Sequence, residues 1–238
     1  MISFVVPAYD EERVLGATLD SIHAAARIAG EPYEIVVADD GSTDGTAAVA
    51  QARGARVVTV AHRQIAATRN SGARVARGDL LVFVDADTLV DERVLRAALA
   101  AMRSGAVGGG AGLRFDGRVP LLARTFTAAL LAFSRAARLA CGCFVFVRRE
   151  AFEAVGGFDE GLFGAEEWAL SRALAARGRF VILREAVTTS GRKLRTHTNL
   201  EHLRLFARIA VRGRRMLGDR RGLDLWYGER RDDPGTAA

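Results

Sequence analysis

The feature that most constrains the fold is a regular alternation of apolar runs and helical patterns across the first 105 residues. The apolar runs cover residues 2–9, 33–41, 55–60 and 79–88. Segments with apolar residues at helical spacing follow them, at 10–30, 42–54, 65–78 and 91–105. Because the runs are nearly all apolar and do not alternate with polar residues, they are typical of parallel strands covered by helices on both faces. The sequence therefore predicts an α/β fold with a mainly parallel sheet.

Two of these helices carry end signals. Asp10, Glu11 and Glu12 fall in the expected first turn of the segment 10–30, where acids interact favourably with the helix dipole. The segment 42–54 opens with Ser, Thr and Asp, which are good helix caps, and Gly54 follows its expected end.

The pattern is less regular after residue 105. We expect strands and helices in the following order: strand 107–115, helix 119–140, strand and short helix within 143–159, helix 166–178, and strand 179–183. Residues 1–190 are predicted to form a single domain with two halves, 1–105 and 106–190. Residues 191–238 are predicted to add a C-terminal extension, made of a basic amphipathic helix at 199–217 and a loose tail.

The net charge of +6 is concentrated near the C-terminus, where residues 192–231 hold 12 Lys and Arg against 4 Asp and Glu. The rest of the chain is nearly neutral, so a nucleic-acid partner is not expected. The basic helix either lies on anionic lipid or packs on the domain with its arginines solvated. No run reaches the ~20 apolar residues of a membrane span, and the first residues lack a signal peptide's basic start. We expect a cytoplasmic protein, with peripheral contact at the inner face of the membrane as the second reading.

Carboxylates follow two of the predicted strands. Asp39 and Asp40 end the second, and the fourth runs into Asp85 and Asp87. Ligands of open α/β sheets bind beyond the carboxyl ends of the strands, so these acids are expected at one rim. A divalent cation such as Mg²⁺ or Mn²⁺, which binds one or two carboxylates together with diphosphate oxygens, would offset their mutual repulsion. The alternative is a pair of solvated acids, with Asp87 or Thr88 capping the next helix.

Five spaced motifs carry a family resemblance: "VVPAYDEE", "VVADDGSTDGT", "ATRNSGARVARGDLLVFVDADT", "FVRREAFEAVGGFDE" and "EEWALSRALAARG". In this order they resemble family 2 glycosyltransferases with the GT-A fold, over residues 2–190. The later "VTTSGRKLR" is similar to a segment of a bacterial branch of that family. The resemblance implies a nucleotide-binding half at 1–105 and an acceptor half at 106–190. It also implies metal-dependent transfer of a sugar, with inversion, from a UDP-, GDP- or dTDP-linked donor to a hydroxyl or phosphate, for instance on a lipid phosphate or a glycan.

The resemblance assigns roles to individual residues. The implied donor-binding residues are Pro7, Ala8, Tyr9, Glu11, Asp39, Asp40, Arg69, Asp85, Ala86 and Arg192. Within this set, Asp40 is expected to bond the nucleotide base in preference to Asp39, and Asp85 to face the ribose or sugar. Asp87 is the implied metal ligand. Arg192 would contact the diphosphate or an anionic acceptor.

The family's catalytic base is usually the second acid of a Glu-Asp pair that opens a helix. Here the pair reads Glu166-Glu167, so Glu167 matches the base, with Glu166 next in line. Without the resemblance, both acids are explained by the helix dipole. Trp168 either stacks on an acceptor sugar or packs in the core, and His197 either lies at the surface or approaches the metal.

Two other functions stay open. A nucleotidyltransferase would need a phosphate-binding loop rich in Gly, Arg or Lys after the first strand, where this chain has "PAYDEE". The same absence argues against dinucleotide-binding and P-loop proteins. A non-catalytic module would bind a nucleotide sugar with Mn²⁺ and transfer nothing. The sequence carries no signal for the sugar, the nucleotide, the acceptor or the oligomeric state.

Overall fold

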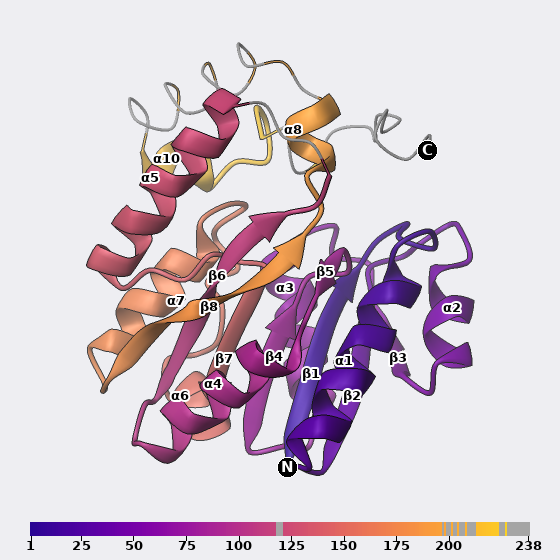
Figure 1. Ribbon diagram of the computed structural model, residues 1–238. Helices are drawn as coiled ribbons and strands as arrows, with labels where there is room; N and C mark the ends of the chain where they lie inside the picture. The colour runs from indigo at the N-terminus through magenta and orange to yellow at the C-terminus, as the bar shows by residue number, and fades with distance from the viewer. Residues whose placement is uncertain are drawn as a thin grey trace.

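The computed structural model describes residues 1–117, 121–196, 198, 201, 204, 208, 213–223 and 227. These residues form an eight-stranded sheet with helices on both faces (Figure 1). The strands are β1 (Ile2–Ala8), β2 (Tyr33–Asp39), β3 (Arg56–Thr59), β4 (Leu80–Val84), β5 (Thr88–Leu89), β6 (Gly108–Phe115), β7 (Phe144–Arg148) and β8 (Phe180–Thr189). The helices are α1 (Leu15–Ala29), α2 (Thr46–Ala52), α3 (Ile65–Val75), α4 (Glu92–Arg103), α5 (Leu121–Ala137), α6 (Arg149–Ala154), α7 (Glu166–Ala175), α8 (Arg192–Thr196) and α10 (Arg214–Leu217).

The strand order is β3-β2-β1-β4-β7-β6-β8-β5. The β1, β2, β3 and β4 strands run parallel, as do β6 and β8, which confirms the mainly parallel sheet. The β7 strand is antiparallel to both β4 and β6, and β5 is antiparallel to β8. The β7 strand comes from the second half of the chain and pairs with β4. The start of β7 therefore lies against the end of β4, with Phe144 opposite Val84. Both halves of the chain therefore contribute to one rim.

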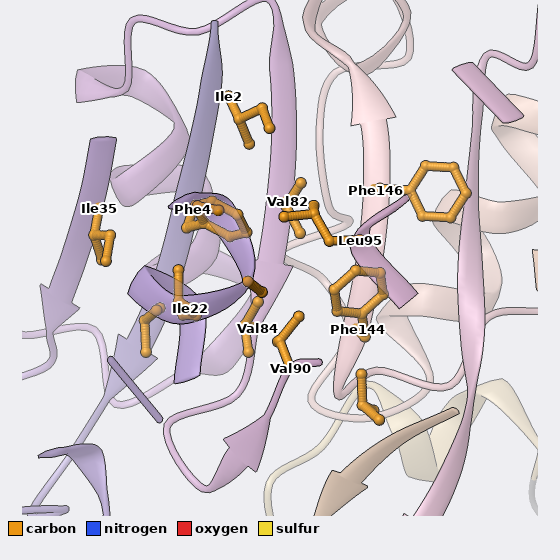
Figure 2. Close-up of a cluster of buried hydrophobic side chains, with 14 of the residues drawn as sticks. Ile2, Phe4, Ile22, Ile35, Val82, Val84, Val90, Leu95, Phe144 and Phe146 are labelled. Atoms are coloured by element: carbon orange, nitrogen blue, oxygen red, sulfur yellow. The ribbon is translucent and has the colours of Figure 1, made fainter. Parts of the chain in front are cut away.

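The two faces of the sheet bury separate apolar clusters. On one face α1 and α4 cover β1 and β4, and Figure 2 shows Phe4, Val82 and Leu95 in this cluster. On the other face, the cluster includes packed phenylalanines, with the Phe83 and Phe158 rings 4.9 Å apart in an edge-to-face arrangement. Side chains of both pleat directions are thus removed from water in β1 and β4, which explains why these two strands are almost entirely apolar.

The glycine run in β6 is required by close packing. A Cβ at Gly109 would lie 2.2 Å from the Val181 carbonyl oxygen and 2.5 Å from Cζ of Phe146. The first of these is a backbone atom and cannot move aside easily. The run therefore serves the packing of β6 between β7 and β8.

Three local expectations about helix ends are wrong. The α1 helix has no acid in its first turn, because it starts at Leu15 and the acids at 10–12 lie in the loop before it. The N-cap of α2 is Gly45, which makes no side-chain cap. The helix after β5 is capped by Asp91, whose Oδ1 accepts a 2.9 Å bond from the Val94 amide, and not by Asp87 or Thr88. The predicted basic helix at 199–217 and the tail lie largely outside the described residues, as does His197.

Candidate active site

The loops after β1 and β2 are tied together by carboxylates at the predicted rim. Asp10 Oδ1 accepts from the Thr43 amide at 2.7 Å, and Glu12 Oε2 accepts from the Gly45 amide at 2.8 Å. Asp10 and Glu12 therefore join the two loops and do not start a helix. They place Tyr9 and Glu11 beside the end of β2.

The two acids that end β2 differ in how fully they are bonded. Asp40 accepts four hydrogen bonds, from the amides of His62, Arg63 and Gln64 and from the Thr68 hydroxyl. It is buried and anchors the loop that enters α3. Asp39 is also buried, and its Oδ1 bonds Ser42, whereas no described residue donates to its Oδ2. Asp39 is thus the member of the pair with bonding capacity to spare.

Arg63 is a site residue that the sequence did not reveal. Its guanidinium carbon lies 3.4 Å from the centre of the Tyr9 ring, in a cation–π contact. Its backbone is in the left-handed region, with a φ of 51°, and Asp40 bonds its amide. Asp40 therefore helps to shape the loop that presents Arg63 to the predicted base-binding tyrosine.

Arg69, on α3, is the central cation of the site. Nη2 bonds Asp85 Oδ1 at 2.7 Å and the Gly142 carbonyl at 3.0 Å, and Nη1 bonds Glu166 Oε1 at 2.7 Å. The residue is only 1% exposed. Burial by itself lowers the pKa of Arg69, but the carboxylates of Asp85, Glu166 and Glu167 raise it further, so the guanidinium stays charged. Arg69 thereby joins the carboxyl end of β4 to the start of α7.

The acid pair at the start of α7 is divided between two roles. Glu166 is buried in its ion pair with Arg69, while no described side chain donates to the half-buried carboxylate of Glu167. Burial and the adjacent Glu166 charge raise the pKa of Glu167 to about 8. A carboxylate with a pKa near the working pH is suited to proton transfer.

Asp87 lies on the other side of Asp85, at the start of β5. Among the described side chains, Thr189 donates a long 3.4 Å bond from its hydroxyl to Asp87 Oδ1, and no other donates to this carboxylate. Burial and the charges of Asp85 and Glu11 raise the pKa of Asp87 to about 6, whereas Lys193 and Arg192 lower it. This excess of negative charge fits a cation site.

The acidic side chains of this site suit Mg²⁺ or Mn²⁺ better than a metal whose ligands all come from the protein. Within the described residues no three His, Cys, Asp or Glu side chains converge as metal ligands. Such ions keep several oxygen ligands from water or from substrate phosphates, and one or two carboxylates are enough to bind them. Asp87 could therefore hold the ion only together with the phosphates of a ligand.

The C-terminal end of β8 returns the chain to this rim. The Ser190 amide donates to the Asp87 carbonyl at 3.2 Å, which fixes the start of α8 beside the acids. There Arg192 Nη2 pairs with Glu11 Oε1 at 3.3 Å. Arg192 and Lys193 thus bring positive charge close to Asp87.

The structure gathers the predicted residues into two groups joined by Arg69. One group consists of Tyr9, Asp39, Asp87 and Arg192, and the other is the acid pair Glu166 and Glu167 of α7. Trp168, next to Glu167, packs against Phe133 of α5 with ring centres 6.2 Å apart. Gly142 was missed by the sequence analysis because its role is a backbone carbonyl, which no side-chain pattern records.

This sheet topology is the GT-A fold, to which the similar solved structures also belong. Residues 3–156 match the model of "Glycosyl transferase family 2". The chain belongs to that family.

Individual relatives are similar over part of the chain. Glucosyl-3-phosphoglycerate synthase of Mycolicibacterium paratuberculosis is 36% identical over 156 residues, which cover 54% of this chain and 47% of the relative. An undecaprenyl-phosphate 4-deoxy-4-formamido-L-arabinose transferase of Pseudomonas paraeruginosa is 37% identical over 94 residues, covering 37% and 28%. A mannosyltransferase of Pyrobaculum calidifontis, solved with GDP-Man and Mn²⁺, superposes with a TM-score of 0.69 at 21% identity, covering 90% of this chain and 62% of that one. The chain spans less than half the length of these curated relatives.

Proposed function

We propose that this chain transfers a sugar from a nucleoside diphosphate sugar to an acceptor hydroxyl, with a divalent cation and with inversion. The observation that carries the proposal is the arrangement around Arg69. It separates Asp87, which is suited to bind a cation, from Glu167, which is suited to accept a proton. A displacement at a sugar carbon needs both functions, on opposite sides of the reacting centre.

The donor is proposed to lie along the rim of β1, β2 and β4. Tyr9, Pro7 and Ala8 would contact the base, and Asp39 would bond it, since the oxygens of Asp40 are already engaged with four protein donors. Asp85 and Ala86 would face the ribose or sugar. The mannosyltransferase of similar fold, which was solved with GDP-Man and Mn²⁺, supports a sugar nucleotide as the ligand class.

The negative charge of the diphosphate would be offset by the ion that Asp87 holds and by the basic residues of α8. When bound, Mg²⁺ or Mn²⁺ would act as a Lewis acid on the leaving diphosphate. Asp87 would hold the ion, and Arg192 with Lys193 would add positive charge from the β8 side. These contacts lower the barrier only if they strengthen as the glycosidic bond breaks.

Glu167 is proposed as the general base. The acceptor oxygen attacks the anomeric carbon as the bond to the diphosphate breaks, and Glu167 takes the hydroxyl proton. A direct displacement of this kind inverts the anomeric centre. An acceptor phosphate is already ionised near neutral pH and needs no base, so a carboxylate to which no described side chain donates favours a hydroxyl acceptor.

The proposal is tested by assaying donors and two variants. UDP-, GDP- and dTDP-sugars are screened by thermal shift with and without Mn²⁺, and the donor found is then used for transfer to candidate acceptors. We expect Asp87→Ala to abolish the Mn²⁺ dependence of donor binding. We expect Glu167→Gln to leave donor binding intact and to lower transfer by about 10²–10⁴-fold, the range of general-base catalysis.

The results separate the alternatives clearly. Unchanged metal dependence in Asp87→Ala would remove Asp87 from the metal site, and near wild-type transfer in Glu167→Gln would move the base elsewhere, with Glu166 tested next. Binding of a nucleoside diphosphate with Mn²⁺ but no transfer to any acceptor would mark a binding module instead.

A further inference from the structure

The exposed surface of helix α5 differs in charge from the rest of the molecule. The helix contains Arg124 and Arg135, Arg138 follows its end, and all three are exposed, whereas residues 121–138 contain no acidic residue. Phe133, within α5, is 53% exposed, the highest value for a large apolar side chain among the described residues. Neither feature belongs to the donor site. An exposed helix surface with one sign of charge and an exposed aromatic ring indicates a partner that is anionic and partly apolar.

The orientation of α5 separates a buried edge from an exposed one. Ser134 is buried and Leu130 and Leu131 are half-buried, so this edge faces the domain. Arg124 and Arg135 are exposed and lie eleven residues apart, about three helical turns, so they share one side of the exposed surface. Phe133 lies on the opposite margin of the same exposed surface, about 160° from Arg135 at 100° per residue. Figure 1 shows α5 standing clear of the sheet, at the upper left.

The charge pattern decides between the occupants of this surface. In a symmetric contact between two copies, the same patch meets itself, and its arginines would repel one another without any acid in the helix to pair with. No described helix is long and apolar enough to cross a bilayer, so an embedded α5 is excluded. A cationic helix with an aromatic side chain at its margin is instead typical of helices that lie in the plane of an anionic bilayer.

We propose that α5 docks on an anionic phospholipid bilayer. Phe133 inserts at the boundary between headgroups and acyl chains, and Arg124 and Arg135 lie at the level of the lipid phosphates. Docking of α5 is distinct from any contact through the C-terminal basic segment.

The position of α5 gives docking a consequence for the proposed reaction, and only this consequence rests on the proposed function. The end of α5 leads directly into the loop whose Gly142 carbonyl accepts a hydrogen bond from Arg69. The Phe133 ring also contacts Trp168, the residue after Glu167. A bilayer under α5 would therefore lie beside the proposed base and would favour acceptors presented at a membrane surface.

The test is co-sedimentation of the full chain with vesicles of phosphatidylcholine, either alone or mixed with phosphatidylglycerol. We expect binding only to the mixed vesicles, and binding that weakens as salt is added. Arg124→Gln with Arg135→Gln should lower the partition coefficient about 25-fold, since one basic residue contributes about fivefold. Phe133→Ser should lower it about tenfold.

A matched pair on α1 controls for the loss of charge and exposed apolar surface in general. Arg27 is exposed and Ile28 is 52% exposed, so Arg27→Gln with Ile28→Ser should leave vesicle binding unchanged. Because Arg135 also bonds the Arg184 carbonyl, Arg124→Gln alone is included as a variant without a packing role. Binding of UDP with Mn²⁺ should be the same in all of these variants, because α5 lies outside the donor site.

Two results would overturn the inference. One is the absence of binding to the mixed vesicles, or binding that the α5 variants do not weaken. The other is a concentration-dependent dimer that Phe133→Ser dissociates, which would make this surface a contact between copies. Vesicle binding through α5 without any sugar transfer would leave the inference standing and remove the proposed function instead.

Discussion

Replacing Arg69 by Met should destabilise the protein strongly, because two carboxylates depend on one buried guanidinium. Glu166 is 5% exposed and Asp85 is 29% exposed, and each bonds Arg69 at 2.7 Å. Removing one partner of a buried ion pair typically costs 3–5 kcal/mol, because the remaining charge stays buried without a partner. The Asp85 contact adds less, since water reaches that carboxylate. The bond to the Gly142 carbonyl adds about 1 kcal/mol.

We expect Arg69→Met to lower the free energy of unfolding by about 4 kcal/mol, measured by urea titration monitored by circular dichroism. Removing the orphaned charge should restore part of this, so the double variant with Glu166→Gln should recover about 2 kcal/mol. Arg103→Met is the matched control. Arg103 pairs with Glu31 at 2.5 Å, but its side chain is 68% exposed, so its loss should cost less than about 1 kcal/mol.

A loss in Arg69→Met no greater than in Arg103→Met would refute the view that Arg69 neutralises buried acids. A double variant less stable than the single one would refute the view that the orphaned Glu166 charge is the main penalty. Either result would mean that packing around the guanidinium matters more than its charge.

Two further predictions concern pH and the glycine strand. With Glu167 as base, the transfer rate should rise with pH to a plateau above about 8, because the protonated carboxyl cannot accept a proton; a rate that does not change across pH 8 contradicts this assignment. In the same titration, metal-dependent donor binding should fall below pH about 6, as Asp87 is protonated. Gly109→Ala should lower the free energy of unfolding by about 1–3 kcal/mol or prevent folding, since its Cβ would meet the Val181 carbonyl at 2.2 Å. Gly164→Ala, whose Cβ would make only ordinary contacts, should change stability little, and equal effects of the two substitutions would contradict the packing explanation.

Much of the fold could be predicted from the sequence because strands buried on both faces have a simple pattern. The apolar runs that became β1, β2, β3 and β4 were found near their observed bounds, and their parallel pairing followed from the helices between them. The helix starts were less predictable. Acids stand at residues 10–12 and at Asp91, yet only Asp91 caps a helix, because Asp10 and Glu12 bond the loop after β2 and Glu11 pairs with Arg192.

The sequence by itself determined the rim of acids, since Asp39, Asp40, Asp85 and Asp87 end strands whose direction the pattern fixes. Only the tertiary structure decided what each acid can do. Asp40 and Glu166 are engaged by donors that lie 22 to 97 residues away, which leaves Asp39 and Glu167 with open carboxylate oxygens. It also decided that α5 is exposed, because an apolar helix in a sequence looks the same whether it is covered by the domain or stands at its surface. In both cases the deciding contacts join segments far apart in the chain, and no local pattern records them.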